Sequence, residues 1–459
     1  MFQVNFDTPV HVHFIGIGGI SMSGLAQIML KAGFTVSGSD AKESALTNEL
    51  KAMGATINIP QAASNITPDI DVVVYTAAIK EDNPEFAAAK SADLPMLTRS
   101  QFLGEIMDNY KIPAGISGTH GKTTTTSMIA QILLEANCDP TISVGGILHS
   151  IGGNIRVGQS DVFITEACEY ANSFLDFRSK YAIILNIEAE HLDFFKDLDD
   201  IRSSFRKFAA NTSADGCNII NGEIENYKEI VENLPARYIT FGRSEGCDYT
   251  AKDITYNENA CATYTAVCKG NPLFEVTLSV PGEHNVLNSL SAIAYARELG
   301  LSDEAILRGL KNFGGADRRF QKKGSFNGVN VIDDYAHHPT EIKATLTAAK
   351  NYPHNRIVCV FQPHTYSRTK AFLGDFADVL GMADIVVLAD IYAAREKNTY
   401  GIYSTDLLKL LKDKGVEAYY FPTFDEIKDF CKKNCLNGDL LITMGAGNVV
   451  EIGESLISE

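Results

Sequence analysis

The sequence predicts an α/β fold of three domains, of which the first and the last are doubly wound, Rossmann-like units. The chain has 459 residues, and at roughly 150 residues per domain this length indicates about three domains. Short β-rich runs alternate with helical patterns along most of the chain, the order expected of parallel sheets covered by helices. Hydrophobic residues make up 45% of the chain, enough to bury sizeable cores. We expect the domains to span residues 1–110, 111–314 and 315–459.

The first domain is predicted from its periodicity. Val10–Ile15 and Gly33–Ser37 are strand-like, and Ser21–Lys31 between them has a helical pattern. Asp71–Ala77 is a continuous Val-rich run, which is typical of a parallel strand buried on both faces. Together these runs indicate a doubly wound unit.

The middle domain is predicted to combine an α/β sheet with an antiparallel patch. Three β-rich runs follow one another between Asp248 and Val280 with turns between them, which indicates antiparallel strands inserted in a larger α/β domain. The other expected elements are strands at Ile112–Ser117, Asp161–Thr165 and Ala182–Asn186, and helices at Thr124–Ala136, His284–Leu299 and Ser302–Asn312.

The last domain follows a predicted hinge at Gly314-Gly315. Its strands alternate with helical segments, so we expect a third α/β unit. The strands are predicted at Val329–Asp333, Arg356–Phe361, Ile385–Leu388 and Leu440–Met444.

The charge of the chain excludes several classes of protein. With 40 basic and 57 acidic residues the formal net charge is −17, which argues against a nucleic-acid coat protein and a basic membrane-surface protein. Phosphate ligands would have to be held by local positive fields. The nine cysteines are scattered without a paired framework, as expected of reduced thiols. We read no signal peptide and no apolar run of about 18 residues, and therefore expect a cytoplasmic protein.

The strongest motif is a glycine-rich loop between a predicted strand and a predicted helix. Its backbone N–H groups and the helix N-terminus favour phosphate, while Lys122 can reach the β- and γ-phosphates and Thr123 can bind Mg²⁺. Ile116 stands where the strict pattern has glycine, so the loop is a variant. The alternative is a turn that only caps the helix. The loop consists of Gly118, Thr119, His120, Gly121, Lys122, Thr123 and Thr124.

A second glycine loop, Gly16–Ser21, also joins a strand to a helix. Ser21 stands at the third glycine position of the dinucleotide fingerprint, so the loop indicates a nucleotide diphosphate better than NAD. Asp40 follows the second strand, where a carboxylate can accept from a ligand hydroxyl or ring N–H. The alternative is close helix–strand packing without a ligand.

Carboxylates and a histidine follow two strands of the middle domain. Glu166 ends one strand, and Glu188 and His191 follow another in the run Asn186–Asp193. Parallel sheets present ligands at this edge, so these side chains are candidates to bind a divalent cation beside the phosphates. Solvated loop residues are the alternative.

The last domain carries a dense group of Arg, His and Asp in three segments. These are Asp317–Phe320, Asp333–Glu341 and Gln362–Arg368. Pro339 fits the first position of a helix, so His337 and His338 are expected in a strand-to-helix loop. Because arginine suits bidentate contacts to carboxylate or phosphate, the group favours an anionic-substrate pocket over a metal site.

Taken together, these motifs resemble those of the Mur ligases, ATP-dependent amide-forming enzymes of bacterial cell-wall synthesis. The similarity extends along essentially the whole chain, and it is greatest to the members that add L-alanine to UDP-N-acetylmuramate. The motifs are HFIGIGGISMSG, SGTHGKTTTT, NIEAEHLD, GEHNVLN, DRRF, DDYAHHPTE, FQPHTYSRT and GAGN.

The resemblance implies a role for each matching residue. The first domain would hold the UDP moiety, the second ATP and Mg²⁺, and the third L-alanine. The residues that would contact the UDP moiety are Gly16, Gly18, Gly19, Ser21 and Asp40, and those that would contact ATP are the loop Gly118–Thr124, His284, Asn285, Asn288 and Asp334. The metal would be bound by Thr123, Glu166 and His191. The amino acid would be bound by Tyr335, His337, His364 and Arg368. The catalytic groups would be Lys122, Arg318, Arg319 and His337.

The sequence departs from the family pattern at two places. Thr365 stands where a basic residue is frequent, so binding of the alanine carboxylate would rest more on Arg368. Cys168 replaces the second acid of an EADE-like run.

The implied chemistry is activation of a carboxylate by phosphoryl transfer. The lactyl carboxylate of UDP-N-acetylmuramate would attack the γ-phosphate, and the amine of L-alanine would then attack the acyl phosphate, with His337 as a candidate base. We expect no nucleic-acid or membrane partner and a monomer or weak homodimer. Three alternatives remain: a recycling ligase of the same family that adds a tripeptide, an NAD(P)-dependent oxidoreductase, and a non-catalytic P-loop sensor.

Overall fold

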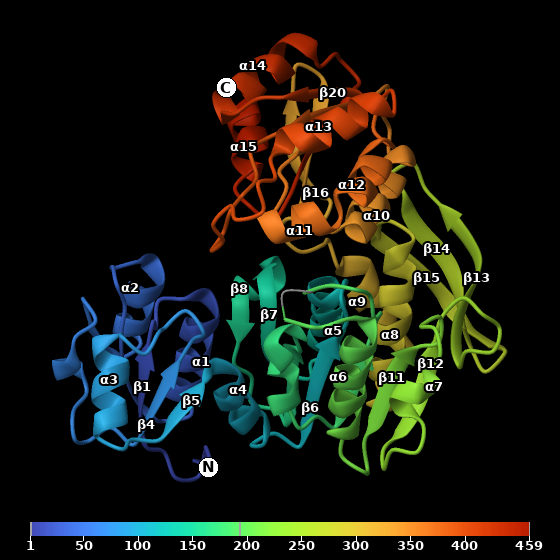
Figure 1. The fold of residues 1–459 in the computed structure, drawn as a ribbon. Coiled ribbons are helices and arrows are strands. Elements are labelled where there is room, and N and C mark those ends of the chain that lie inside the picture. The colour runs from blue at the N-terminus through green and yellow to red at the C-terminus, as the bar shows by residue number, and fades with distance from the viewer. Residues whose placement is uncertain (1, 192–193, 459) are drawn as a thin grey trace. The chain divides into compact units, whose positions relative to one another are not determined.

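The computed structural model describes residues 2–191 and 194–458. The chain divides into two compact units, one made of the residues up to Tyr249 with Ser291–Gly309, the other of Thr250–Leu290 with Leu310–Glu459. Three β-sheets lie within these residues, each accompanied by helices (Figure 1). The predicted α/β class is therefore confirmed.

The first sheet has the strand order β3-β2-β1-β4-β5, and all its strands are parallel. The order reverses direction at β1, which makes the sheet doubly wound. Its elements are β1 (His11–Ile15), α1 (Ile20–Lys31), β2 (Thr35–Ser39), α2 (Ala45–Ala52), β3 (Thr56–Asn58), η1 (Ala63–Asn65), β4 (Val72–Tyr75), α3 (Pro84–Ser91), β5 (Met96–Thr98) and α4 (Arg99–Met107).

Alternate residues of β1 and β4 face opposite sides of this sheet, as strand geometry requires. Phe14 and Val74 pack in one core with α1 and α4, whereas Val73 packs in a separate core with Ala89 of α3. The Val-rich run is thus buried on both faces, as predicted for a parallel strand.

The second sheet carries the phosphate-loop motif. Within the first unit its strands lie in the order β12-β11-β10-β6-β9-β7-β8, parallel except for β8. The elements are β6 (Ile112–Ser117), α5 (Lys122–Glu135), β7 (Thr141–Leu148), η2 (His149–Ile151), β8 (Gly153–Arg156), β9 (Val162–Glu166), η3 (Tyr170–Asp176), β10 (Tyr181–Ile184), α6 (Leu198–Ala210), β11 (Cys217–Asn221), α7 (Lys228–Val231) and β12 (Arg237–Phe241).

The predicted antiparallel patch is confirmed. It consists of β13 (Tyr249–Tyr256), β14 (Cys261–Cys268) and β15 (Asn271–Pro281), which are adjacent in the order β13-β14-β15, and β14 pairs with β15 in the antiparallel direction. Tyr249 at the start of β13 pairs with Phe241 of β12. Two helices follow, α8 (His284–Glu298) and α9 (Asp303–Asn312).

The third sheet has the order β16-β17-β21-β18-β19-β20, with β16 antiparallel to the rest. Alternate residues of β18 again face two cores, so that Phe361 packs with α10 and α12 while Val360 packs with α14 and α15. The elements are β16 (Gln321–Phe326), β17 (Val329–Asp334), α10 (Pro339–Lys350), β18 (Ile357–Phe361), α11 (Tyr366–Ala371), α12 (Leu373–Leu380), β19 (Ile385–Leu388), α13 (Ser404–Asp413), β20 (Glu417–Tyr420), α14 (Phe424–Asn434), β21 (Leu440–Met444) and α15 (Val450–Ser458).

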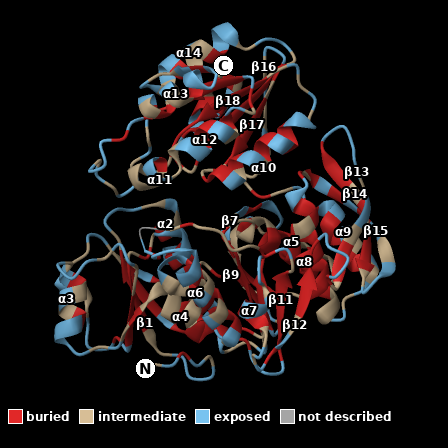
Figure 2. Cartoon of the chain, turned by 45° about the vertical axis from the view of Figure 1, so that its right-hand side comes forward, coloured by how far each residue is buried: buried red, intermediate tan, exposed pale blue. Residues whose placement is uncertain are grey.

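The sheets are the buried part of each region, and the helices expose their outer faces (Figure 2). The nine cysteines are free thiols. Within the described parts of the chain, no helix combines the length and the apolar character needed to cross a membrane.

Candidate active site

The phosphate loop lies between β6 and α5 and depends on two glycines with left-handed backbone angles. Gly118 has φ 146° and Gly121 has φ 84°. A Cβ at position 118 would lie 2.9 Å from Cβ of Leu185, so the loop also needs the missing side chain. Gly121 is the N-cap of α5, and no side chain caps that end. The first-turn N–H groups of this 14-residue helix therefore lack a side-chain cap, an arrangement that favours an anion such as phosphate.

Lys122 is the first residue of α5, and its ammonium lies over the loop. Nζ donates to the carbonyl oxygens of Gly118 at 2.5 Å and Thr119 at 3.1 Å. It also lies 3.0 Å from Oε2 of Glu169, whose side chain is 2% exposed. Burial by itself would lower the pKa of Lys122, but the Glu169 carboxylate outweighs it and raises the pKa above its usual value. Lys122 is therefore a permanent cation.

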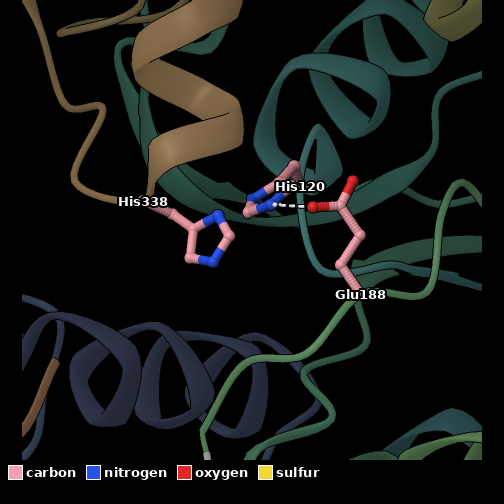
Figure 3. Close-up of side chains that lie close together, drawn as sticks. All are labelled: His120, Glu188 and His338. Atoms are coloured by element: carbon pink, nitrogen blue, oxygen red, sulfur yellow. Dashed lines mark ion pairs between the residues drawn. The ribbon is translucent and has the colours of Figure 1, made fainter. Parts of the chain in front are cut away.

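The segment after β10 holds the loop in place. Asn186 binds the main chain of His120 on both sides, with Oδ1 accepting from N at 2.8 Å and Nδ2 donating to O at 3.1 Å. The N–H of Glu188 donates to Oγ1 of Thr119 at 2.9 Å. Nε2 of His120 lies 3.4 Å from Oε2 of Glu188 (Figure 3). These contacts fasten the phosphate loop to the segment after β10.

Two of the three predicted metal ligands approach the same pair of glycines in β7. Oε1 of Glu166 accepts from the N–H of Gly145 at 2.5 Å. A Cβ added to Gly146 would lie 3.1 Å from Cγ2 of Thr123. Glu166, at the end of β9, and Thr123, in the first turn of α5, therefore lie beside adjacent glycines of β7, and their carboxylate and hydroxyl are the hard oxygen ligands that Mg²⁺ prefers.

The third predicted metal ligand, His191, contacts a different carboxylate. Its Nε2 lies 3.7 Å from Oε1 of Glu169, and its ring lies 4.6 Å from that of Tyr170. Glu169 thus joins His191 to Lys122. The last two residues of the NIEAEHLD motif, 192 and 193, lie outside the described residues.

The N-terminal glycine loop is fastened to the end of β2. The N–H groups of Gly16 and Ile17 donate to the carbonyl oxygen of Ser39 at 2.8 and 2.9 Å. Oδ2 of Asp40 accepts from the N–H of Gly18 at 2.9 Å, and a Cβ at Gly18 would meet that oxygen at 2.8 Å.

The remaining residues of this loop lie at the start of α1. Gly19 is the N-cap of the helix and has no side-chain cap, and Ser21 is in its first turn. The arrangement brings together all five residues that sequence analysis assigned to the UDP moiety.

The two arginines of the DRRF motif lie in different environments. The Arg318 guanidinium donates to Asp333 at 2.9 Å and to the carbonyl oxygens of Gly447 and Gly445 at 2.9 and 2.7 Å. Arg319 lies 3.8 Å from the Glu341 carboxylate. Arg318 therefore ties the DRRF segment to β17 and to the GAGN segment, whereas Arg319 makes a looser ion pair.

Asp334 ends β17 and is 6% exposed. Its carboxylate accepts from the N–H groups of Phe320 at 2.9 Å and Ala336 at 2.8 Å. Burial raises the pKa of Asp334 to about 6, although Arg319 and the two N–H groups oppose the rise.

Hydrogen bonding assigns the tautomer of His337. Its Nδ1 lies 3.0 Å from the carbonyl oxygen of Tyr335 and 3.1 Å from Oε2 of Glu341, and both oxygens only accept. Nδ1 therefore carries the hydrogen, and Nε2 is the ring atom that can take up a proton. Pro339 begins α10, as predicted, with His338 as its N-cap.

His364 has the opposite tautomer. Its Nδ1 lies 2.9 Å from Nη1 of Arg368, and because a guanidinium only donates, Nδ1 must accept. The ring stacks on Tyr392 with centroids 5.7 Å apart and lies 5.6 Å from the ring of His337. Three of the predicted amino-acid residues therefore lie together, and Tyr335 completes the group through its ring contact of 5.4 Å with His337.

The residues of the GEHNVLN motif that were predicted to contact the nucleotide, His284, Asn285 and Asn288, lie at the start of α8. Gly282 precedes them with φ 101°, and a Cβ there would meet the His284 ring at 2.5 Å. Nδ2 of Asn285 donates to the Pro281 carbonyl at 2.7 Å, and Nδ2 of Asn288 donates to Oδ1 of Asn285 at 3.0 Å.

Sequence reasoning missed several residues that shape these groups. Glu169 binds Lys122, Gly145 and Gly146 approach the metal candidates, and Glu341 contacts both Arg319 and His337. Glu169 stands three places after Glu166 in the acidic run, which is a signal that could have marked it. The glycine pair lies within β7 itself, a strand that the sequence analysis did not predict.

The chain belongs to the Mur ligase family. Residues 11–111 match the Mur ligase family catalytic domain, residues 116–296 the Mur ligase middle domain, and residues 318–447 the Mur ligase glutamate ligase domain. The resemblance found in the sequence is thus confirmed.

Individual relatives match along the whole chain. The chain is 66% identical over 459 residues to UDP-N-acetylmuramate--L-alanine ligase of Agathobacter rectalis, with 100% of both chains covered. It is 58% identical over 458 residues to the ligase of the same name of Lachnospira eligens, again with 100% of both covered. The crystal structure of UDP-N-acetylmuramate-alanine ligase from Thermotoga maritima matches with a TM-score of 0.80, 31% identity and 98% coverage of each chain.

Proposed function

We propose that this chain is the ligase that joins L-alanine to the lactyl carboxylate of UDP-N-acetylmuramate, with ATP cleaved to ADP and phosphate. The product is UDP-N-acetylmuramoyl-L-alanine, a precursor of peptidoglycan. The observation that carries the proposal is the full-length identity of 66% to a ligase of that name. The phosphate loop, with Lys122 at the start of α5, supports the use of ATP.

The domains proposed for this reaction are residues 1–110 for the nucleotide sugar, 111–314 for ATP and 315–459 for the amino acid. Gly16, Gly18, Gly19, Ser21 and Asp40 would contact the UDP moiety. The N-terminus of α1 supports this role because it has no side-chain cap and favours phosphate. The Asp40 carboxylate supports it because it can accept hydrogen bonds from hydroxyl or ring N–H groups.

Phosphoryl transfer to a carboxylate brings two anions together, so cations must offset their repulsion. Lys122 is a fixed positive charge at the phosphate loop. Of the two arginines, Arg319 is the better candidate to contact the transferring phosphate, since the Arg318 guanidinium already donates to Asp333, Gly445 and Gly447.

Thr123 and Glu166 would hold Mg²⁺, and His191 would complete the set from the segment after β10. The donor set fits a hard cation, since Thr123 offers a hydroxyl and Glu166 a carboxylate, and the two residues lie beside adjacent glycines of β7. When bound, the ion neutralises charge on the phosphate oxygens. His284, Asn285, Asn288 and Asp334 would contact the nucleotide.

The amino acid would bind at the His337, His364 and Arg368 group, beside Tyr335. Arg368 would hold the alanine carboxylate, and Nε2 of His337 would accept the proton that the amine loses as it attacks. The Nδ1 hydrogen bond to the Tyr335 carbonyl supports this role, because it leaves Nε2 as the basic atom. The cytoplasm is the proposed compartment, and a monomer or weak homodimer the proposed state.

The experiment that tests the proposal is an ADP-release assay with UDP-N-acetylmuramate and a panel of acceptors. L-Alanine should support release, and the product should gain the mass of one alanine residue. Preference for a preformed tripeptide would indicate the recycling ligase instead, and an absorbance change of a nicotinamide would indicate an oxidoreductase.

A further inference from the structure

A chain of polar contacts runs through the first sheet, and the proposed reaction uses none of its members. It begins at Asp69 on the surface and ends at two side chains that are 0% exposed, His13 of β1 and Glu85 in the first turn of α3. A buried carboxylate is costly unless its oxygens are satisfied, so its partners need an explanation.

The outer part of this chain consists of two histidines on either side of a serine. Nδ1 of His11 lies 2.9 Å from Oδ2 of Asp69, and its Nε2 lies 2.7 Å from Oγ of Ser37. Nδ1 of His13 lies 2.9 Å from the same hydroxyl, and its Nε2 lies 3.6 Å from Oε2 of Glu85. The carboxylate of Glu85 therefore faces an imidazole on this side.

The inner part consists of donors to both oxygens of Glu85. Oγ of Ser39 donates to Oε2, while Nδ2 of Asn65 and the N–H of Ala62 donate to Oε1 at 2.5 and 3.3 Å. Burial opposes ionisation, but contacts from His13, Ser39 and Asn65 outweigh it and lower the pKa of Glu85. Glu85 is thus an ionised acceptor beneath the end of β2.

Ser39 connects this carboxylate to the N-terminal glycine loop. Its hydroxyl binds Glu85, and its carbonyl oxygen accepts from the N–H groups of Gly16 and Ile17 at 2.8 and 2.9 Å. The next residue, Asp40, accepts from Gly18. The first half of the loop is therefore held by two consecutive residues, one of which is fixed by Glu85.

We propose that Glu85 is a positioning residue for the nucleotide sugar, which acts through Ser39 to hold the glycine loop in its binding conformation. The inference rests on the proposed role of this loop. Glycine-rich backbone loses much entropy when it is ordered, so a loop that is held before the ligand arrives binds more tightly. The effect should appear in the affinity for the uridine nucleotide and leave the later steps unchanged.

Ser39→Ala tests the link, and Ser37→Ala is its matched control. Both remove a buried hydroxyl from β2, two residues apart, but only Ser39 joins Glu85 to the loop. We expect Ser39→Ala to raise KM for UDP-N-acetylmuramate about three- to tenfold, the effect of one hydrogen bond, with kcat and KM for ATP unchanged. Ser37→Ala should leave all three constants unchanged. Equal KM values in the two variants would overturn the proposal.

A double-mutant cycle tests whether Glu85 acts through Ser39. If it does, Glu85→Gln should raise the same KM, and the double variant Ser39→Ala/Glu85→Gln should match Ser39→Ala alone. Additive effects on KM would overturn the proposed path, because they would mean that Glu85 acts by another route. Thermal unfolding of each variant shows how much stability is lost apart from the change in KM.

Direct binding separates this inference from the proposed function. Calorimetry with UDP should show binding to the unaltered chain and weaker binding to Ser39→Ala. Equal dissociation constants would overturn the positioning role while the role of the loop stands. Absence of UDP binding to the unaltered chain would overturn both.

Discussion

The ammonium of Lys122 lies 3.0 Å from the buried carboxylate of Glu169. Glu169 also lies 3.7 Å from His191, so one carboxylate joins the phosphate loop to the segment after β10. A buried ion pair contributes little net stability, but removal of one partner is costly because the other charge is left unpaired. Replacement of Lys122 should therefore affect stability through Glu169 and activity through the phosphate loop, and the two effects can be measured separately.

Lys122→Ala should abolish most of the ligase activity. Removal of one preorganised cation typically costs about 100- to 1,000-fold in rate, and the measurement is phosphate release that depends on both UDP-N-acetylmuramate and the amino acid. The variant should also lose about 3 kcal/mol of unfolding free energy, because the buried Glu169 carboxylate loses its ammonium partner.

The double variant Lys122→Ala/Glu169→Gln is the control for that loss. It should recover stability without recovering activity, while Lys111→Ala, which removes an exposed lysine paired with Asp161, should change neither. Near-normal phosphate release from Lys122→Ala would contradict the assignment of the loop.

Replacement of Arg318 should mainly lower stability, whereas replacement of Arg319 should mainly lower activity. Arg318→Ala leaves the Asp333 carboxylate, which is 0% exposed, without its guanidinium, so about 3 kcal/mol of unfolding free energy should be lost. Arg319→Ala should retain stability but lower kcat about 100-fold or more. Denaturant unfolding and steady-state kinetics on both variants check this. The division of roles would be wrong if Arg319→Ala were the less stable of the two.

The glycine pair in β7 offers a test of the metal site. Gly145→Ala would place a Cβ 2.9 Å from the Glu166 carboxylate, which must then move. Since shifts of supporting contacts cost about tenfold in metal affinity, the Mg²⁺ concentration for half-maximal activity should rise by about that factor. Gly153→Ala in β8 meets nothing within 4 Å and should leave it unchanged. The same Mg²⁺ requirement in both variants would argue against Glu166 as a ligand.

Asp334 should make stability depend on pH. Its pKa is raised from 3.8 to about 6, so the folded state favours the protonated form, and stability is lost as the pH rises through about 6. About two pKa units correspond to roughly 3 kcal/mol. The unfolding free energy of the unaltered chain, relative to that of Asp334→Asn, should fall by about this amount between pH 4 and pH 7. A difference that stays constant, or one that grows with pH, would contradict the raised pKa.

Hydrophobic runs and loop motifs predicted most of the sheet framework. Ile112–Ser117, Ile385–Leu388 and Leu440–Met444 coincide with β6, β19 and β21, because continuous apolar runs mark strands buried on both faces. The run Gly33–Ser37 was placed two residues early, since β2 extends to Ser39. The hairpin of β7 and β8 was not predicted, because its four glycines weaken the apolar signal.

The sequence predicted candidate site residues that stand next to strand ends. It did not predict the hydrogen bonds and ion pairs that these side chains make with residues distant in the sequence. Glycine loops and strand-end acids indicated Lys122, Glu166 and Asp334. The sequence does not reveal that Arg318 is occupied by Asp333 and two carbonyl groups, since these partners lie 15, 127 and 129 positions away. Nor does it reveal the opposite tautomers of His337 and His364, which are set by contacts with a carbonyl and a guanidinium.

The most direct test of the proposed function is product analysis after incubation with ATP, Mg²⁺, UDP-N-acetylmuramate and L-alanine. The proposal predicts ADP and phosphate in equal amounts and a nucleotide sugar heavier by one alanine residue, with none of these when L-alanine is omitted. Formation of ADP without the heavier nucleotide, or a product formed only with a tripeptide, would contradict it.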